Sequence, residues 1–181
     1  MKPVKELFEE HVKSNEIRMH CLEVGTIMRF LAREFNEDEE KWYTIGLLHD
    51  LDFETEKDLK THGLKTAEIL RKEGYDEALI NSILSHNEGG LGVKRESKLD
   101  YALSAADNIS GLIYSYGLMR KGLEGMEVSG LKKKFKAPAF AAAVRRDLIA
   151  DIEKTGMTFD KFFEISIKAM QSIAKEIGFE K

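Results

Sequence analysis

Five histidines are spread along this chain of 181 residues, and four of them fall on predicted apolar helix faces or at helix ends. A single histidine on an apolar face is usually a core residue whose ring nitrogens bond to neighbouring polar groups. Four such histidines and two nearby aspartates would each need a separate buried partner, whereas one shared cation would satisfy them all. The candidate metal ligands are His20, His49, Asp50, His62, His86 and Asp107.

The spacing of these candidates matches one helix plus a turn at each step. The intervals are 29, 13, 24 and 21 residues, counted from His20 through His49, His62 and His86 to Asp107. Ligands on successive helices of a bundle can converge on one point in its interior. Mixed imidazole and carboxylate donors suit Fe, Mn, Zn, Co or Ni better than Ca. A metal of this kind can lower the pKa of its bound water toward neutrality.

The elements that must position these side chains are predicted to be helices, because helical spacing is common in the chain and sustained alternation is rare. We predict an all-α fold, a single bundle of about seven to nine helices. Asp76 is expected to cap a helix that ends at His86, and Thr61 one that runs to Glu73. The further expected helices are 4–11, 15–31, 36 or 38 to 49, 97–119 and two within 137–179. The segments 51–60 and 120–136 are expected to be a loop and a lid or linker.

Length and composition favour one intracellular domain. We expect residues 1–181 to form it, with a metal-site core at about 15–120 and C-terminal helices at 137–179 packed on this core. The formal charge of −4 and a pI near 5.8 argue against a dedicated nucleic-acid binder or a polybasic membrane binder. The single cysteine, the charged N-terminus and the lack of a long apolar run predict a cytoplasmic protein without signal peptide or membrane span.

The ordered ligand set resembles a known signature. His20, the run GLLHD at 46–50 and AAD at 105–107 are similar to the metal-binding motif of the HD superfamily, a group of helical metal-dependent phosphohydrolases. The resemblance covers about residues 15–120 and implies that the histidine, the His-Asp pair and the last aspartate hold one metal ion. The run LHDLDFE at 48–54 and, more loosely, KKFK at 133–136 resemble a branch of predicted HD hydrolases with an undefined substrate.

A second metal ion is implied by the same resemblance. His62 and His86 fall where two-metal branches of the superfamily carry two extra histidines, and Asp50 would then bridge the metals. The implied cofactor is therefore one or two divalent transition metals, with Fe, Mn, Co, Ni and Zn all open. Asp50 is followed by Leu-Asp-Phe-Glu rather than the Gly-Lys of the HD-GYP branch, which argues against a cyclic-dinucleotide substrate.

Other polar residues are weaker candidates for chemistry. Asp52 and Glu54 could act as catalytic carboxylates near a metal-bound water, or could simply belong to an acidic capping loop. Glu23, one turn beyond His20, could accept a hydrogen bond from an imidazole or be a surface glutamate. The substrate-binding candidates, whose alternative reading is solvated surface charge or a helix end, are Arg18, Asn87, Lys134, Lys136 and Arg145.

The leading hypothesis is a metal-dependent phosphohydrolase that attacks a nucleotide or other small phosphate ester with a metal-activated water. Its expected partner is a small anionic, phosphate-containing substrate, and the sequence carries no signal for a particular oligomeric state. A di-iron oxygenase similar to inositol oxygenase is an alternative, because the ligand set can be the same. A non-catalytic helical binding module is the third hypothesis.

Overall fold

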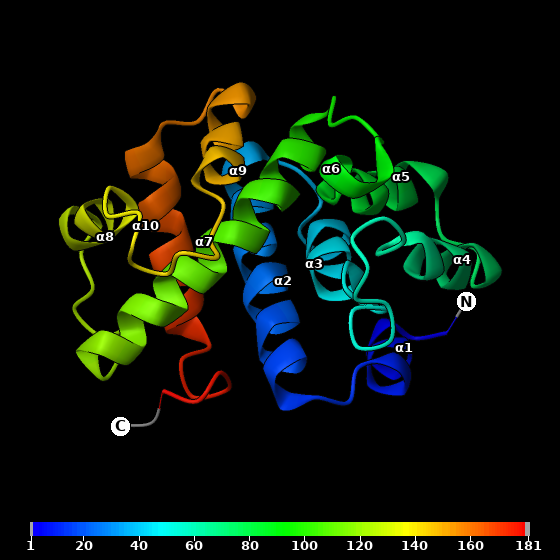
Figure 1. The fold of residues 1–181 in the computed structure, drawn as a ribbon, viewed down its shortest axis with the longest axis horizontal. Helices are drawn as coiled ribbons and strands as arrows, with labels where there is room; N and C mark the ends of the chain where they lie inside the picture. The colour runs from blue at the N-terminus through cyan, green and yellow to red at the C-terminus, as the bar shows by residue number, and fades with distance from the viewer. Residues whose placement is uncertain (1, 180–181) are drawn as a thin grey trace.

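The computed structural model describes residues 2–179, and every regular element within them is a helix (Figure 1). Eight of the ten α-helices have eight residues or more, so the predicted all-α bundle is confirmed. The elements are α1 (Val4–His11), α2 (Asn15–Phe35), α3 (Glu39–Leu48), α4 (Leu64–Lys72), α5 (Glu77–His86), α6 (Glu88–Leu91), α7 (Lys98–Arg120), α8 (Val128–Phe135), α9 (Arg146–Ala150), a 3-10 helix (Asp151–Thr155) and α10 (Phe159–Ser172).

The long helix α2 runs through the middle of the molecule (Figure 1). Its apolar stripe of Val24, Ile27, Met28 and Leu31 is fully buried, as the helical spacing of these residues requires. Helix α3 crosses α2 at very short range, because a Cβ atom on Gly46 would lie only 2.7 Å from the Cα of Gly25. This close crossing brings the end of α3 next to the N-terminal half of α2.

The second long helix, α7, packs against α2, α3, α5, α8, α9 and α10. It begins with a capping box, in which the side chains of Ser97 and Asp100 each bond to the other residue's backbone N–H. Its buried positions include the small residues Ser104, Ala105 and Ala106, which let neighbouring helices approach closely. One turn of α7 therefore lies within reach of side chains from α2 and α3.

Two of the predicted elements differ from the structure. Thr61 does not cap a helix: its hydroxyl donates to the carbonyl of Asp58, and α4 begins only after Gly63, whose φ of 98° suits glycine. The segment 120–136, expected to be a lid or linker, contains α8. Leu131 of α8 is fully buried against the core, so this part of the chain is a packed helix. The predicted cap Asp76 accepts a hydrogen bond from the amide of Ala78 and is confirmed.

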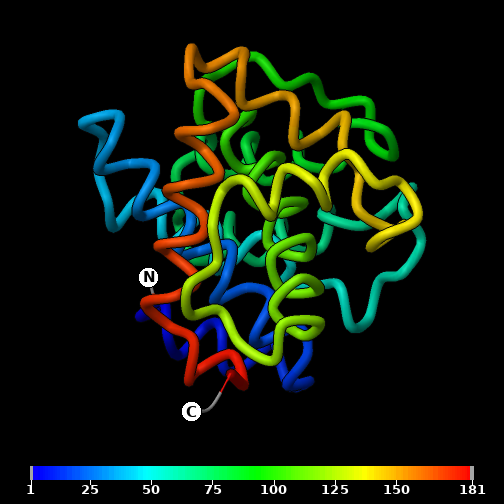
Figure 2. Tube along the Cα trace, turned by 90° about the vertical axis from the view of Figure 1, so that its left-hand side faces the viewer, coloured from blue at the N-terminus to red at the C-terminus, as the bar shows by residue number. Residues whose placement is uncertain are grey.

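The loop between α8 and α9 is held by one arginine. The guanidinium of Arg146 donates hydrogen bonds to backbone carbonyls of the preceding loop, those of Phe135, Ala137, Phe140, Ala141 and Val144. Residues 136–145 therefore form a compact loop without a regular element. In Figure 2 this loop and the segment 51–63 lie on the same side of the molecule. No helix within residues 2–179 is long and apolar enough to cross a membrane.

Candidate metal centre

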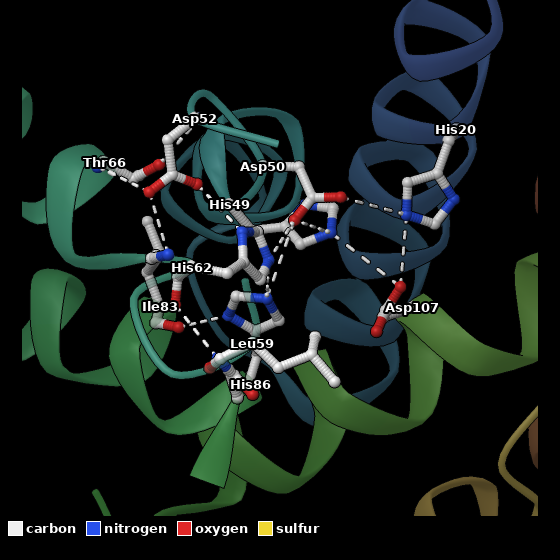
Figure 3. Close-up of polar contacts among 12 residues, drawn as sticks. His20, His49, Asp50, Asp52, Leu59, His62, Thr66, Ile83, His86 and Asp107 are labelled. Atoms are coloured by element: carbon white, nitrogen blue, oxygen red, sulfur yellow. Dashed lines mark hydrogen bonds and ion pairs between the residues drawn. The ribbon is translucent and has the colours of Figure 1, made fainter. Parts of the chain in front are cut away.

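All six predicted ligands converge at one point of the bundle (Figure 3). His20 comes from α2 and Asp107 from α7, while the other four lie at helix ends or in turns: His49 caps α3, Asp50 follows it, His62 precedes α4 and His86 ends α5. Two groups of three have ligand atoms within 4.8 Å of one another, namely His20, His49 and Asp50, and Asp50, His62 and His86. Asp50 belongs to both groups and lies between them.

The first cluster, which we define as His20, His49, Asp50 and Asp107, is built around two carboxylates. The Nε2 atom of His20 lies 3.1 Å from Oδ1 of Asp107 and 3.7 Å from Oδ2 of Asp50. The Nε2 atom of His49 lies 3.4 Å from Oδ1 of Asp50 and 3.9 Å from Oδ1 of Asp107. Two imidazole nitrogens therefore face two carboxylates across a space of a few ångströms.

The second cluster, which we define as Asp50, His62 and His86, has one carboxylate and two imidazoles. The Nε2 atoms of His62 and His86 lie 3.1 and 3.6 Å from Oδ1 of Asp50. They also lie 3.1 Å from each other. Both clusters thus use the same carboxylate, which could bridge two metal ions.

The ring orientations of the histidines fit a metal ion. The Nδ1 atoms of His49 and His86 contact the backbone carbonyls of Gly46 and Ile83, so each ring donates through Nδ1 and leaves a lone pair on Nε2. Nε2 of His49 is buried and makes no hydrogen bond within the described residues. A buried lone pair without a donor beside two carboxylates fits a divalent transition metal, which this donor set prefers.

Asp52 holds His62 in place. Its Oδ1 atom lies 2.9 Å from Nδ1 of His62, and its Oδ2 atom accepts hydrogen bonds from the amides of Gly63 and Thr66. The hydroxyl of Thr66 in turn accepts from the amide of Asp52 at 3.1 Å. The carboxylate thereby fixes the ring of His62 and the turn that carries it, as partners of metal-bound histidines commonly do. Its predicted catalytic role stays a prediction.

The charges of the centre stabilise one another. Burial opposes protonation of His20 and His62, but the neighbouring carboxylates outweigh it, and they raise the pKa of His20 to about 9 and that of His62 to about 10. Burial likewise opposes ionisation of Asp50 and Asp107, yet the facing imidazoles hold the pKa of both carboxyls below its usual range. Two ionised carboxylates therefore persist at the centre, and a metal ion would release the ring protons when it binds.

A pocket of about 750 Å³ opens over the two clusters. This volume falls in the range of small-molecule sites. Five of the six ligands border it, and only His49 lies behind the others. The remaining lining residues are Glu16, Ile17, Met19, Glu23, Phe53, Leu59, Asn87, Asn108, Gly111, Tyr114, Ala143, Arg145 and Leu148. The candidate centre is thus open to a ligand from one side.

Two of the predicted substrate-binding residues border this pocket. The amide nitrogen of Asn87 donates to the carbonyls of Leu59 and His62, so its side chain fastens the segment that carries His62. The guanidinium of Arg145 is forked with the carboxylate of Asp147 at 2.9 and 2.6 Å. The backbone amide of Arg145 donates to Asn108, the neighbour of Asp107, which ties this loop to the centre.

The other predicted residues lie outside the pocket lining. Glu54 accepts hydrogen bonds from the amides of Lys13 and Ser14, and so holds the connection between α1 and α2. The guanidinium of Arg18 donates to the carbonyl of Val12 and lies over a phenylalanine ring. Lys134 lies over aromatic rings of the C-terminal part, and Lys136 is exposed. A functional role for these four residues stays a prediction.

Some residues that shape the centre carry no clear signal in the sequence. Thr66 is an ordinary helix residue by its type, and only the folded turn brings it to Asp52. Ser110 lies one turn after Asp107, and its hydroxyl is 3.4 Å from Nδ1 of His20. Helical spacing alone would have placed Ser110 on the correct face, but not opposite a particular ring.

Fold and site together define an all-helical protein with a candidate metal centre, and a comparison with known families identifies its class. The model of the HD domain matches residues 17–112, so the chain belongs to the HD-domain family and the resemblance seen in the sequence is confirmed. The buried His/Asp clusters are consistent with divalent metal binding.

Curated relatives of the chain are named ribonuclease Y. The protein from Oleidesulfovibrio alaskensis is 29% identical over 138 residues, which cover 71% of this chain and 26% of the relative. The protein from Thermotoga petrophila is 30% identical over 142 residues, or 74% and 27% of the two chains, and that from Mesoplasma florum is 35% identical over 98 residues, or 52% and 18%. The chain therefore spans only about a quarter of these relatives or less. No solved structure gives a significant match.

Proposed function

We propose that this chain is a metal-dependent phosphohydrolase that acts on a nucleotide or another small phosphate ester through a metal-activated water. The observation that carries the proposal is the pair of clusters that share Asp50 at the base of an open pocket. A bridging carboxylate with imidazoles on both sides suits two divalent ions a short distance apart. Membership of the HD-domain family supports the same reaction class.

Each group at the centre has a role in this proposal. His20, His49, Asp50 and Asp107 would hold one metal ion, and Asp50, His62 and His86 the other. When bound, the ions would polarise the phosphoryl oxygens and lower the pKa of a water molecule. Asp52 keeps the ring of His62 oriented. Among the described residues that line the pocket, Arg145 has the one lysine or arginine side chain. Its guanidinium would offset phosphoryl charge once it leaves Asp147.

RNA is the second candidate substrate, because the curated relatives carry the name ribonuclease Y. The lining of the pocket favours the small ester. It contains the carboxylates of Glu16, Glu23, Asp50 and Asp107 but a single arginine and no lysine. A single-stranded nucleic acid is usually followed by a positively charged groove. Strand cleavage would therefore need positive charge outside this pocket.

The test begins with the metal content of protein purified without added metal, by elemental mass spectrometry. About two ions per chain are expected, as the two ligand groups require. A panel of nucleotides, small phosphate esters and short RNAs is then assayed before and after chelation, with an oxygen electrode alongside. Chelator-sensitive release of phosphate from small esters supports the proposal. Iron with oxygen consumption would favour the oxygenase, and absence of metal even after reconstitution would leave a binding module.

A further inference from the structure

One buried carboxylate of the pocket has no part in the proposed metal chemistry. Glu23 lies on α2, one turn after His20, and only 3% of its surface is exposed although it borders the pocket. No residue among 2–179 donates a hydrogen bond to it. Burial raises its pKa to about 8, although His20 opposes the shift. Its carboxylate oxygens are not among the fully buried polar atoms that lack a partner, so they open into the pocket, where a ligand can hydrogen-bond to them.

Glu23 does not orient His20, which was one expectation from the sequence. The Nε2 atom of His20 faces Asp107 and Asp50, and its Nδ1 atom is nearest to Ser110. Both nitrogens of the ring are therefore engaged elsewhere. The alternative of a surface glutamate is equally excluded by the burial of this side chain. The carboxylate is left to face the pocket alone.

Part of the pocket that Glu23 borders is apolar. On α2, Met19 lies one turn before Glu23, and on α7 the pocket wall includes Gly111 and Tyr114. Ile17, Phe53 and Leu148 add further apolar surface. A wall of this kind accommodates a flat or apolar group, and a polar group placed within it selects the ligand by hydrogen bonding. The metal clusters at the base of the same pocket would hold the phosphate.

We propose that Glu23 is a specificity-determining residue, which accepts a hydrogen bond from an N–H or O–H group on the organic part of the substrate. This inference rests on the proposed function, in which the phosphate lies at the metal clusters. The substrate class is then a small phosphate ester whose organic part combines an apolar or aromatic surface with a donor. A site built around such a hydrogen bond rejects analogues that lack the donor, because the buried acceptor is left unpaired.

Recognition can be tested without hydrolysis by using nucleosides, which carry rings and donors but no phosphate. The probe is a chemical-shift titration of the ¹⁵N-labelled chain with the four ribonucleosides, with and without added Zn²⁺. At least one nucleoside is expected to shift the amides of Gly111 and Tyr114. Glu23→Gln, which replaces one of the two oxygens by an NH₂ group, should weaken that binding by about tenfold, as the loss of one hydrogen bond implies.

The matched control is Glu34→Gln, the same change on an exposed position of α2 that pairs with Lys161. It should bind the nucleoside as the unchanged chain does. Should Glu23→Gln fail to fold, Gly111→Met fills the pocket from α7 and should abolish the shifts. Absence of binding by the unchanged chain, or equal binding by Glu23→Gln, would overturn the inference. Binding that depends on Glu23 in a chain that hydrolyses no ester would support recognition and refute the hydrolase.

Discussion

The two ligand clusters are held in place by different means. In the first cluster, His20 and Asp107 project from the two longest helices, and His49 caps a third. These helices are fixed by core packing, including the contact of Gly46 with Gly25. Three of the four residues of the first cluster are therefore positioned by packed helices.

The second cluster depends on a turn and on a few hydrogen bonds. His62 lies in the turn before α4, where Asp52 contacts its ring and Asn87 binds its carbonyl. His86 is the last residue of α5, a helix of ten residues. Turns held by a few hydrogen bonds open more easily than packed helices. We infer that the two clusters can lose metal separately, with the second the more easily disturbed.

The largest effect is expected at the ligand that the clusters share. Asp50→Asn removes the bridging carboxylate, so both sites should lose their metal and phosphate release should fall on the order of 10³-fold. The measurements are metal content per chain and kcat/KM. Asp160→Asn, at an exposed residue that pairs with Lys132, is the control and should change neither. Retention of one full metal equivalent by Asp50→Asn would show that the carboxylate does not bridge.

A smaller effect is expected behind the first cluster. Gly46→Ala would place a Cβ atom 2.7 Å from the Cα of Gly25, and backbone of α2 cannot give way as a side chain would. Overpacking of this kind destabilises a fold by about 1–3 kcal/mol. Thermal unfolding should show a lower Tm, and both clusters should lose metal together because the whole bundle is affected. An unchanged Tm would mean that α2 and α3 are not held at this distance.

Most of the centre could be predicted from the sequence, because its ligands lie on helix faces and at helix ends that local patterns mark. His20 and Asp107 are 87 residues apart in the sequence, yet each falls on an apolar face of a recognisable helix. The resemblance to the HD superfamily then grouped them. Asp52 illustrates the limit: its position beside the His-Asp pair suggested catalysis, but its contact with His62 depends on the path of the turn.

The C-terminal part could be predicted less well, for a physical reason. Three consecutive lysines and a nearby glycine obscure the apolar spacing of Val128, Leu131 and Phe135, so the sequence pattern predicts a lid or linker where α8 forms. The loop beyond α8 has no periodic sequence pattern. Its backbone carbonyls accept hydrogen bonds from the guanidinium of Arg146 and not from a helical backbone. Local periodicity does not report hydrogen bonds of this kind.

A change beside the turn that carries His62 should disturb the second cluster more than the first. Gly90→Ala would place a Cβ atom 1.8 Å from the carbonyl oxygen of Leu59, so the segment that carries His62 must move. The second metal should bind about 10–100-fold more weakly, while the first metal and the Tm change little. Competition with a chelator measures the two affinities. Gly89→Ala is the matched control, since nothing lies within 4 Å of its Cβ position. Equal weakening of both metals would contradict separate clusters.

The smallest effect is expected at the residue that orients His62. Asp52→Asn keeps the size of the side chain but removes the charge that faces Nδ1 of His62, which should weaken the second metal by about tenfold. Asp58→Asn, in the same turn segment but exposed, is the control and should leave both affinities as they are. If Asp52→Asn instead lowers kcat while both metals stay bound with full affinity, Asp52 acts on the reaction itself, as its position next to the His-Asp pair first suggested. Weaker binding of the second metal alone assigns it to positioning, and shows that a single carboxylate in a turn, rather than helix packing, determines the strength of the second cluster.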